Sequence, residues 1–285
     1  MTADFHNDVL TAQKKRELLE DYSSSGNTVV CAYYKGSRTF ADAYSACKDF
    51  CEKGYEKMYL AFEDFSYSTE LTALDALLSF SPVYVTLTWN DSNALGGGAL
   101  SVSGLTALGE AVINLLNERK ISLDLAHANE KTFFRAEELS LSPVCSHTCF
   151  YDVCPHPRNL KREQIRAIVE RKGIIGLAFY PPFLKADGVA CVEDIIRHVD
   201  YYCERFSPEY LAIGSDINGC ESYIDGFSDY GFEPILKEAL EKRGYPRKII
   251  QGILSDNLKR FLGDKIRSPI IYNKESGYGS HNNLR

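Results

Sequence analysis

The stretch Ala3-Asp4-Phe5-His6-Asn7-Asp8-Val9-Leu10 places a histidine and an aspartate two residues apart near the start of the chain. Side chains alternate between the two faces of a strand, so His6 and Asp8 share a face if this segment is extended. An imidazole nitrogen and a carboxylate oxygen that project together are suitable ligands for a divalent metal such as zinc. A surface turn with polar residues is the other interpretation. Recurrence of such ligands at later strand ends decides between the two.

Composition narrows the classes of protein to which the chain can belong. The 285 residues carry a formal net charge of -7, which argues against a surface built for nucleic acid or anionic membranes. No apolar run approaches the ~20 residues that span a bilayer, and no basic segment followed by an apolar one marks an export signal. The nine cysteines form no C-x-x-C pair, so we expect reduced thiols and a cytoplasmic location.

Seven further apolar, β-rich runs follow the first stretch, mostly alternating with segments of helical spacing. The runs occupy residues 28–34, 57–65, 82–90, 121–127, 143–148, 173–180 and 210–219. Helices are expected at 40–55, 69–78, from 104 onward, and at 132–139, 161–172, 192–206, 233–243 and 246–262. Strands with little polar alternation are typical of a parallel sheet covered by helices, and eight such units predict a (β/α)8 TIM barrel. We expect one barrel domain over residues 1–264 and a polar tail over 265–285.

Polar side chains lie where several of the predicted strands end. In a (β/α)8 barrel the carboxyl ends of all strands meet at one mouth, where functional groups gather. The candidates at these ends are His6, Asp8, Glu63, His127, His147 and Asp216. Taken alone, Glu63 could equally be a cap for the next helix, since a carboxylate is costly to bury unpaired. The joint placement of these residues at the same end of their strands predicts a metal site.

The motifs that carry these residues resemble those of the membrane (renal) dipeptidase family, a branch of the metal-dependent hydrolases built on the amidohydrolase barrel. The motifs are FHND, the glutamate after MYLAF, LTWNDSN, DLAH, SHT followed by HPRNL, FY, and GSDINGC. The resemblance covers most of the chain, up to the segment Asp256-Asn257-Leu258-Lys259-Arg260-Phe261. Each motif is weak evidence alone, whereas the combination is specific.

The resemblance implies a binuclear zinc centre. His6, Asp8 and Glu63 look like ligands of one ion, and Glu63, His127 and His147 look like ligands of the other, with Glu63 shared between them. Two dications ~4 Å apart repel strongly, and a bridging anion offsets that repulsion. The implied cofactors are therefore two divalent metal ions, with Zn2+ as the expected identity.

The resemblance also implies roles for residues around the metals. Asp216 looks like the catalytic acid/base, and Arg158 looks like the residue that binds the substrate's terminal carboxylate through two parallel hydrogen bonds. Tyr180 and Asn90 are expected to contact substrate as well. Trp89 is a departure, because the family's well-studied dipeptidases have a histidine there that is held to contact substrate and the developing oxyanion. An indole offers one donor and no basic nitrogen, so Trp89 puts substrate orientation in question.

Two functions stay open from the sequence. The first is a binuclear zinc dipeptidase that hydrolyses dipeptides, with a D-residue on the carboxyl side among the substrates considered. The second is an amidohydrolase-type metal enzyme acting on another amide, ester or lactone, or a metal-binding barrel with lost catalysis. The ligand set and Asp216 argue against lost catalysis, whereas Trp89 keeps other substrates open. The expected partner is a small dipeptide, and a homodimer is one alternative for the oligomeric state.

The remaining histidines and a helical cysteine pair are interpreted as structural. His156 is expected to support its loop, His198 to be solvated on a charged helix, and His281 to lie in the tail. Cys47 and Cys51 stand four residues apart on a predicted helix. We expect them to be small buried helix residues rather than a metal pair.

Overall fold

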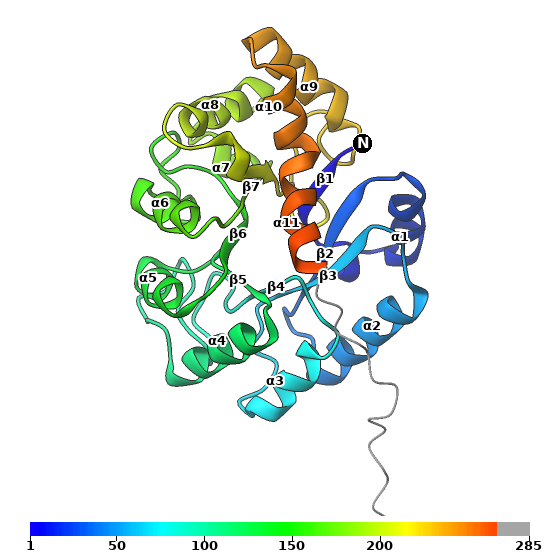
Figure 1. The fold of residues 1–285 in the computed structure, drawn as a ribbon, viewed down its shortest axis with the longest axis vertical. Coiled ribbons are helices and arrows are strands. Elements are labelled where there is room, and N and C mark those ends of the chain that lie inside the picture. Colours follow the sequence, from blue (N-terminus) through cyan, green and yellow to red (C-terminus); the bar gives the residue numbers. More distant parts are fainter. Residues whose placement is uncertain (267–285) are drawn as a thin grey trace, which may run out of the picture.

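Eight parallel strands form a closed barrel in the computed structural model, which describes residues 1–266, and side chains as far as residue 263 (Figure 1). The strands are β1 (Ala3–Asn7), β2 (Thr28–Tyr34), β3 (Met58–Glu63), β4 (Tyr84–Thr86), β5 (Ser122–Asp124), β6 (Pro143–Thr148), β7 (Ile175–Leu177) and β8 (Leu211–Ile213). Each strand pairs with the next along the chain, and β8 pairs with β1. The predicted (β/α)8 barrel is confirmed, although several strands are shorter than the apolar runs that predicted them.

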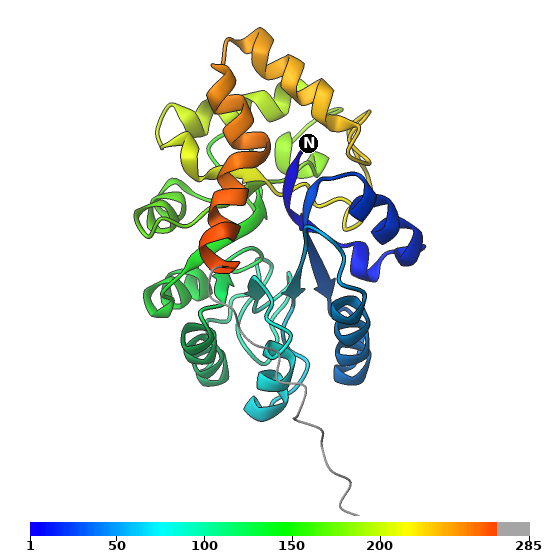
Figure 2. The same cartoon turned by 45° about the vertical axis from the view of Figure 1, so that its right-hand side comes forward.

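Helices surround the barrel on its outer side (Figures 1 and 2). They are α1 (Lys15–Ser24), α2 (Phe40–Lys53), α3 (Leu71–Leu78), α4 (Ala107–Arg119), α5 (Glu130–Leu139), α6 (Arg162–Glu170), α7 (Pro181–Leu184), α8 (Val192–Cys203), α9 (Phe232–Arg243), α10 (Arg247–Gln251) and α11 (Asn257–Ile266). Helix α2 begins at a capping box in which Thr39 accepts from the Asp42 backbone and Asp42 from that of Thr39. In the described part of the chain, no helix is long and apolar enough to cross a membrane.

Three helical segments differ from the prediction, and one of them is the short helix α7 after β7, which was not predicted from the sequence. Helix α1 was not expected, because Leu19 and Tyr22 are the only buried side chains on an otherwise charged segment. The C-terminal helix predicted over 246–262 is interrupted by a π-helical turn, η3 (Gly252–Asp256). Directly after this turn, the Asn257 side-chain amide donates to the carbonyls of Pro208 and Leu211, both at 2.7 Å. The widened turn therefore coincides with a side chain that fastens the helix to the entrance of β8.

Helix α11 closes the amino-terminal end of the barrel, and Figure 1 shows it lying across the ring of strands. Leu258 and Leu262 are buried in a cluster with Phe5 and Tyr84 from the barrel interior. The rings of Phe5 and Phe261 meet edge to face, 5.6 Å apart. With this end filled by apolar side chains, polar chemistry is confined to the carboxyl-end mouth. The helix continues to Ile266, whereas the rest of the predicted tail and His281 lie outside the described residues.

Candidate metal centre

The barrel brings the six predicted strand-end residues together at one mouth. His6 and His147 lie within β1 and β6, and Glu63 is the last residue of β3. Asp8 directly follows β1, while His127 and Asp216 each lie three residues beyond the end of their strands. The five predicted metal ligands are at most 5% exposed. His6 and His147 each lie where the strand register shifts, between Asp4 and Asn7 in β1 and between Cys145 and Thr148 in β6, whereas the others depend on how the loops turn.

Glu63 faces the histidines with both of its oxygens. Its Oε1 atom lies 2.7 Å from His127 Nε2 and 3.7 Å from His147 Nε2, and these two nitrogens are 2.9 Å apart. Its Oε2 atom lies 3.9 Å from His6 Nε2. Both oxygens of one carboxylate thus face nitrogen donors, which is the arrangement that a bridging ligand requires.

A second group of donors lies around His6. The Nε2 atom is 3.1 Å from Asp8 Oδ2 and 3.7 Å from Asp216 Oδ1. The other oxygen of Asp8, Oδ1, is buried and has no hydrogen-bond partner. Among the described residues, two sets of side chains converge closely enough to hold an ion: His6 with Glu63 and His147, and His6 with Asp8 and Asp216. An unsatisfied buried carboxylate oxygen beside such donors fits a bound cation.

Each of the three clustered histidines is held through its Nδ1 atom, which leaves Nε2 directed into the cluster. The contacts are His6 Nδ1 to Tyr84 Oη at 2.7 Å, His147 Nδ1 to Ser146 Oγ at 2.8 Å, and His127 Nδ1 to Asn90 Oδ1 at 2.9 Å. Asn90 can only accept through Oδ1, so His127 Nδ1 carries the proton and Nε2 keeps its lone pair. Partners of this kind fix the ring orientation and raise the basicity of a metal ligand.

Asp124 holds Ser146, the residue that contacts His147 Nδ1, in place. Its Oδ2 atom accepts from the hydroxyls of Ser146 (2.6 Å) and Thr86 (2.5 Å), and its Oδ1 atom accepts from the Ser146 backbone (2.7 Å). Because the Ser146 hydroxyl is committed to Asp124, its oxygen is left to accept from His147. Sequence reasoning missed Tyr84, Ser146 and Asp124. The one signal available was the position of Ser146 directly before His147.

The electrostatics of the cluster favour bound cations. Burial alone lowers the pKa of His6, but the carboxylates of Asp8, Glu63 and Asp216 outweigh it and raise that pKa to about 10. Burial, assisted by the charge on Asp8, raises the pKa of Glu63 well above its usual range. Burial also lowers the pKa of His127 far below its ordinary value and so keeps the imidazole neutral. Buried carboxylates such as Glu63 need a cation nearby, and neutral imidazoles such as His127 can donate a lone pair. Together they form the donor set that a divalent metal binds.

The two site residues that lie beyond β5 and β8 have an unusual backbone conformation. His127 and Asp216 adopt left-handed conformations, with φ of 65° and 63°. Such conformations are uncommon outside glycine and concentrate at functional sites. Gly219 passes directly over the cluster, where an added Cβ would overlap Asp8 Oδ2 and crowd Asp216 Oδ1. A side chain at this position would displace both carboxylates.

A cavity of about 520 Å³ opens above the cluster, and nine of the ten predicted site residues line it, with His6 lying beneath. The guanidinium of Arg158 is buried here: its Nη2 donates to the His147 carbonyl at 3.4 Å and its Nε has no partner. Arg158 also lies over the Phe183 ring, 5.3 Å from the centroid. Trp89 is 38% exposed and lies between Tyr34 and His127, with ring centroids 5.6 and 5.9 Å away.

Two structural assignments from the sequence were wrong. His198 is fully buried instead of solvated: its Nδ1 accepts from the Phe150 backbone and its Nε2 donates to the Leu184 carbonyl, both at 3.2 Å. It lies on the inner face of α8. The many charged residues of that helix led the sequence analysis to place His198 in solvent. Cys51 is exposed, whereas Cys47 is buried as expected. His156 supports its loop, since its Nδ1 accepts from the Arg158 backbone at 3.2 Å.

A closed parallel barrel with a buried histidine and carboxylate cluster at its carboxyl-end mouth defines a barrel of the metal-dependent hydrolase type. Residues 8–268 match the family model for membrane dipeptidase (peptidase family M19), and the chain belongs to this family. The predicted family is therefore confirmed, and with it the classification among the metallo-dipeptidases.

Several individual proteins are similar to this chain. An uncharacterized protein in the pqqA 5′ region of Klebsiella pneumoniae is 33% identical over 187 residues, covering 61% of this chain and 69% of that protein. Dipeptidase tcpJ of Claviceps purpurea is 30% identical over 185 residues, covering 63% of this chain and 44% of that protein. A solved metallopeptidase from Rhodobacter sphaeroides, liganded with a phosphinate mimic of the dipeptide L-Ala-D-Ala, shares the fold with a TM-score of 0.79 at 22% identity, covering 92% and 98% of the two chains.

Proposed function

We propose that this chain is a binuclear zinc dipeptidase that hydrolyses free dipeptides, including those with a D-residue on the carboxyl side. The observation that carries the proposal is one cavity that holds both a buried cluster of metal donors and a buried guanidinium without an acidic partner among the described residues. The dipeptide mimic bound by the Rhodobacter sphaeroides relative supports the substrate class and the D-residue.

Five residues would hold the ions. His6 and Asp8 would bind one, His127 and His147 the other, and Glu63 would bind both. The orphan Asp8 oxygen, the two separately directed Glu63 oxygens and the neutral imidazoles of His127 and His147 fit this assignment. When bound, such ions polarise a carbonyl and lower the pKa of water, which peptide hydrolysis at neutral pH requires.

The chain's own groups would bind the dipeptide and move its protons. Arg158 would pair with the terminal carboxylate, because its unpartnered Nε and its terminal nitrogens supply parallel donors. Asp216 would take a proton from the attacking water and deliver it to the leaving amine. Burial raises the pKa of Asp216 to about 6, a range in which a carboxyl group can both accept and donate at neutral pH.

Trp89 favours a second candidate, an amidohydrolase-type enzyme acting on another amide, an ester or a lactone. Its indole lines the same cavity but offers a single donor and cannot replace an imidazole as a base or as a cationic donor. A substrate without a terminal carboxylate would leave Arg158 buried and unpaired, which is the reason that we favour the dipeptide.

The test combines metal analysis with a matched substrate panel. We expect near two equivalents of metal per chain in zinc-loaded protein, and hydrolysis of L,L and L,D dipeptides.

Arg158→Lys should lower kcat/KM about tenfold or more for a free dipeptide but little for its carboxyl amide, because an ammonium cannot form the two-pronged contact. A stoichiometry of one or less would refute the binuclear centre. Equal losses on acid and amide would make Arg158 structural.

A further inference from the structure

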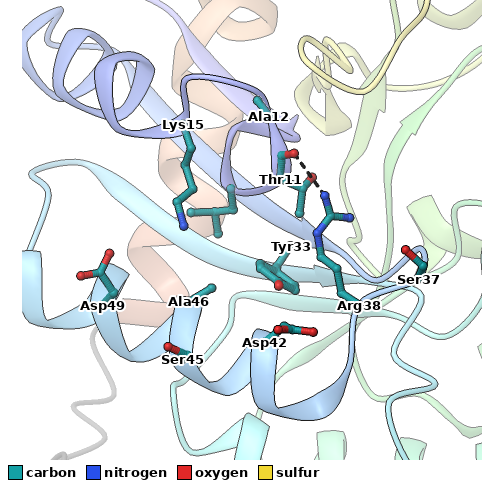
Figure 3. A pocket seen from close by; sticks show the side chains of 11 residues that line it. Thr11, Ala12, Lys15, Tyr33, Ser37, Arg38, Asp42, Ser45, Ala46 and Asp49 are labelled. Atoms are coloured by element: carbon teal, nitrogen blue, oxygen red, sulfur yellow. Dashed lines mark hydrogen bonds between the residues drawn. The ribbon is translucent and has the colours of Figure 1, made fainter.

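Arg38 is a second arginine at the mouth and lies between β2 and α2. It lines the cavity above the metal cluster and also an outer groove of about 750 Å³ beside α2, so it forms part of the wall between them. Figure 3 shows its guanidinium directed at Thr11, whose carbonyl accepts from Nη2 at 3.3 Å. Its Nη1 donates to the Tyr34 carbonyl at 3.2 Å. These two contacts hold the side chain in place and leave further donors unused.

Arg38 forms no ion pair in the described part of the chain, although its charge is close enough to Asp42 to help the hydrogen bonds from Thr39 lower the pKa of that carboxyl group. Both of its hydrogen bonds go to neutral backbone carbonyls. Asp42, which lines the outer groove with it, is engaged instead at the start of α2, where its Oδ2 accepts from the Thr39 backbone and hydroxyl at 2.8 and 2.7 Å. A half-buried guanidinium that is held in place but not neutralised is prepared to bind an anion.

The barrel topology places Arg38 across the mouth from Arg158. In the ring of eight strands, β2 and β6 are four positions apart and therefore face each other. Arg38 follows β2, Arg158 follows β6, and both line the cavity that contains Glu63. A dipeptide whose carboxylate lies on Arg158 and whose scissile carbonyl lies over the metal cluster extends its amino-side residue away from Arg158, toward the β2 side.

Two aromatic rings form a wall on this side. Tyr34 at the end of β2 and Trp89 after β4 lie 5.6 Å apart, at an interplanar angle of 44°. Both line the cavity, and the Tyr34 carbonyl is one of the two groups that hold Arg38. Methylene groups can pack against such rings while a polar end reaches a charged partner.

We propose that Arg38, with Tyr34 and Trp89, forms the subsite for the amino-side residue and selects an acidic side chain there. The side-chain methylenes pack against the aromatic wall, and the carboxylate pairs with the unused donors of Arg38. This inference rests on the proposed dipeptidase function. It assigns Trp89 a place in substrate selection and gives the unneutralised charge of Arg38 a partner.

The test compares two dipeptides that differ only in the amino-side residue, L-Glu and its neutral isostere L-Gln, each followed by the same alanine. We expect the zinc-loaded protein to favour the glutamyl dipeptide by about tenfold or more in kcat/KM, the scale of a hydrogen bond to a charged group. Arg38→Gln should bring this ratio close to one, and Arg38→Lys should keep part of it. Arg16→Gln, at an exposed position on α1, should leave the ratio unchanged. The ratio is independent of the folded fraction of each variant.

Each outcome decides the proposal. A wild-type ratio of one or below overturns the acidic subsite while leaving the dipeptidase function intact. A ratio that survives in Arg38→Gln assigns the preference to another residue and likewise overturns it. If the zinc-loaded protein hydrolyses neither these dipeptides nor a dialanine control, the proposed function itself fails, and the subsite fails with it.

Discussion

Asp216 combines the features expected of a proton carrier with those of a group that could touch a metal. It has a left-handed backbone, a pKa that burial raises to about 6, and an Oδ1 atom 3.7 Å from His6 Nε2. Its other oxygen, Oδ2, accepts from the Cys220 thiol at 3.2 Å. These contacts orient the carboxylate without an arginine or lysine ion pair among the described residues, so it stays able to exchange a proton.

The Asp216→Asn variant separates the two roles. An amide keeps the shape but cannot accept the proton, so we expect turnover to fall by ~10²-fold or more. Metal content should stay near that of the wild type if Asp216 is not an essential ligand. Asp225→Asn, at an exposed acid in the same loop, serves as the matched control and should retain turnover. Near-normal turnover in Asp216→Asn would assign the proton transfer elsewhere.

The burial of His198 should make the stability of the protein depend on pH. Burial lowers its pKa from 6.5 to about 4, so the unfolded chain binds a proton more readily than the folded one between these values. The stabilisation is complete above pH 6.5 and is lost as the pH falls toward 4. From pH 7.5 to 5.0 this residue should lower the free energy of unfolding by about 2 kcal/mol.

Chemical denaturation of wild type and His198→Gln at both pH values measures this effect. Other titrating groups contribute to both proteins, so the difference between their pH dependences isolates His198. We expect the variant to be less stable at pH 7.5 but to lose less stability on acidification. Parallel pH dependences would show that the proton uptake of His198 is not coupled to folding.

At the scale of elements, α11 acts as the closure of the barrel. Leu258 is fully buried against the barrel interior, while its neighbour Lys259 is exposed. Leu258→Ala should lower the free energy of unfolding by about 2–5 kcal/mol, because it leaves a cavity that the rigid strands cannot fill. Lys259→Ala, the control, should change it by no more than about 0.5 kcal/mol.

The Leu258→Ala substitution should lower stability without lowering metal affinity. The metal cluster lies at the opposite end of the barrel, so folded Leu258→Ala protein should still bind metal as the wild type does. Loss of metal affinity at a temperature where the variant is fully folded would show that α11 also positions the ligands.

At the scale of the whole molecule, we expect the cluster of donor residues to couple metal binding to folding. Asp8, Glu63 and Asp216 are brought together only in the folded barrel, where His6 is their nearest positive partner. Removing divalent ions with a chelator should therefore lower the melting temperature, and zinc should restore it in proportion to the logarithm of its free concentration. At 1,000 times the dissociation constant the gain is about 4 kcal/mol.

Thermal unfolding with and without chelator measures this coupling. Asp8→Asn removes one ligand charge and should reduce the zinc-dependent shift. An identical melting temperature in the presence and absence of zinc would contradict a metal centre built into the fold.

The sequence by itself determined the ring of eight strands and the residues that meet at its mouth. Apolar runs alternating with helical segments report a parallel barrel, and that topology brings His6, Glu63 and His147 to the same end wherever the loops go. These features follow from local pattern combined with one global rule, so they can be inferred without coordinates.

Only the tertiary structure decided which polar groups are partnered and which are not. His198 was expected in water because its helix is charged, yet α8 turns it against the loop after β6. Nothing local indicates that Tyr84 supports His6, or that Arg38 and Arg158 form no ion pairs among the described residues. Burial and pairing depend on what distant segments pack against a side chain, and periodicity along one segment carries no information about that.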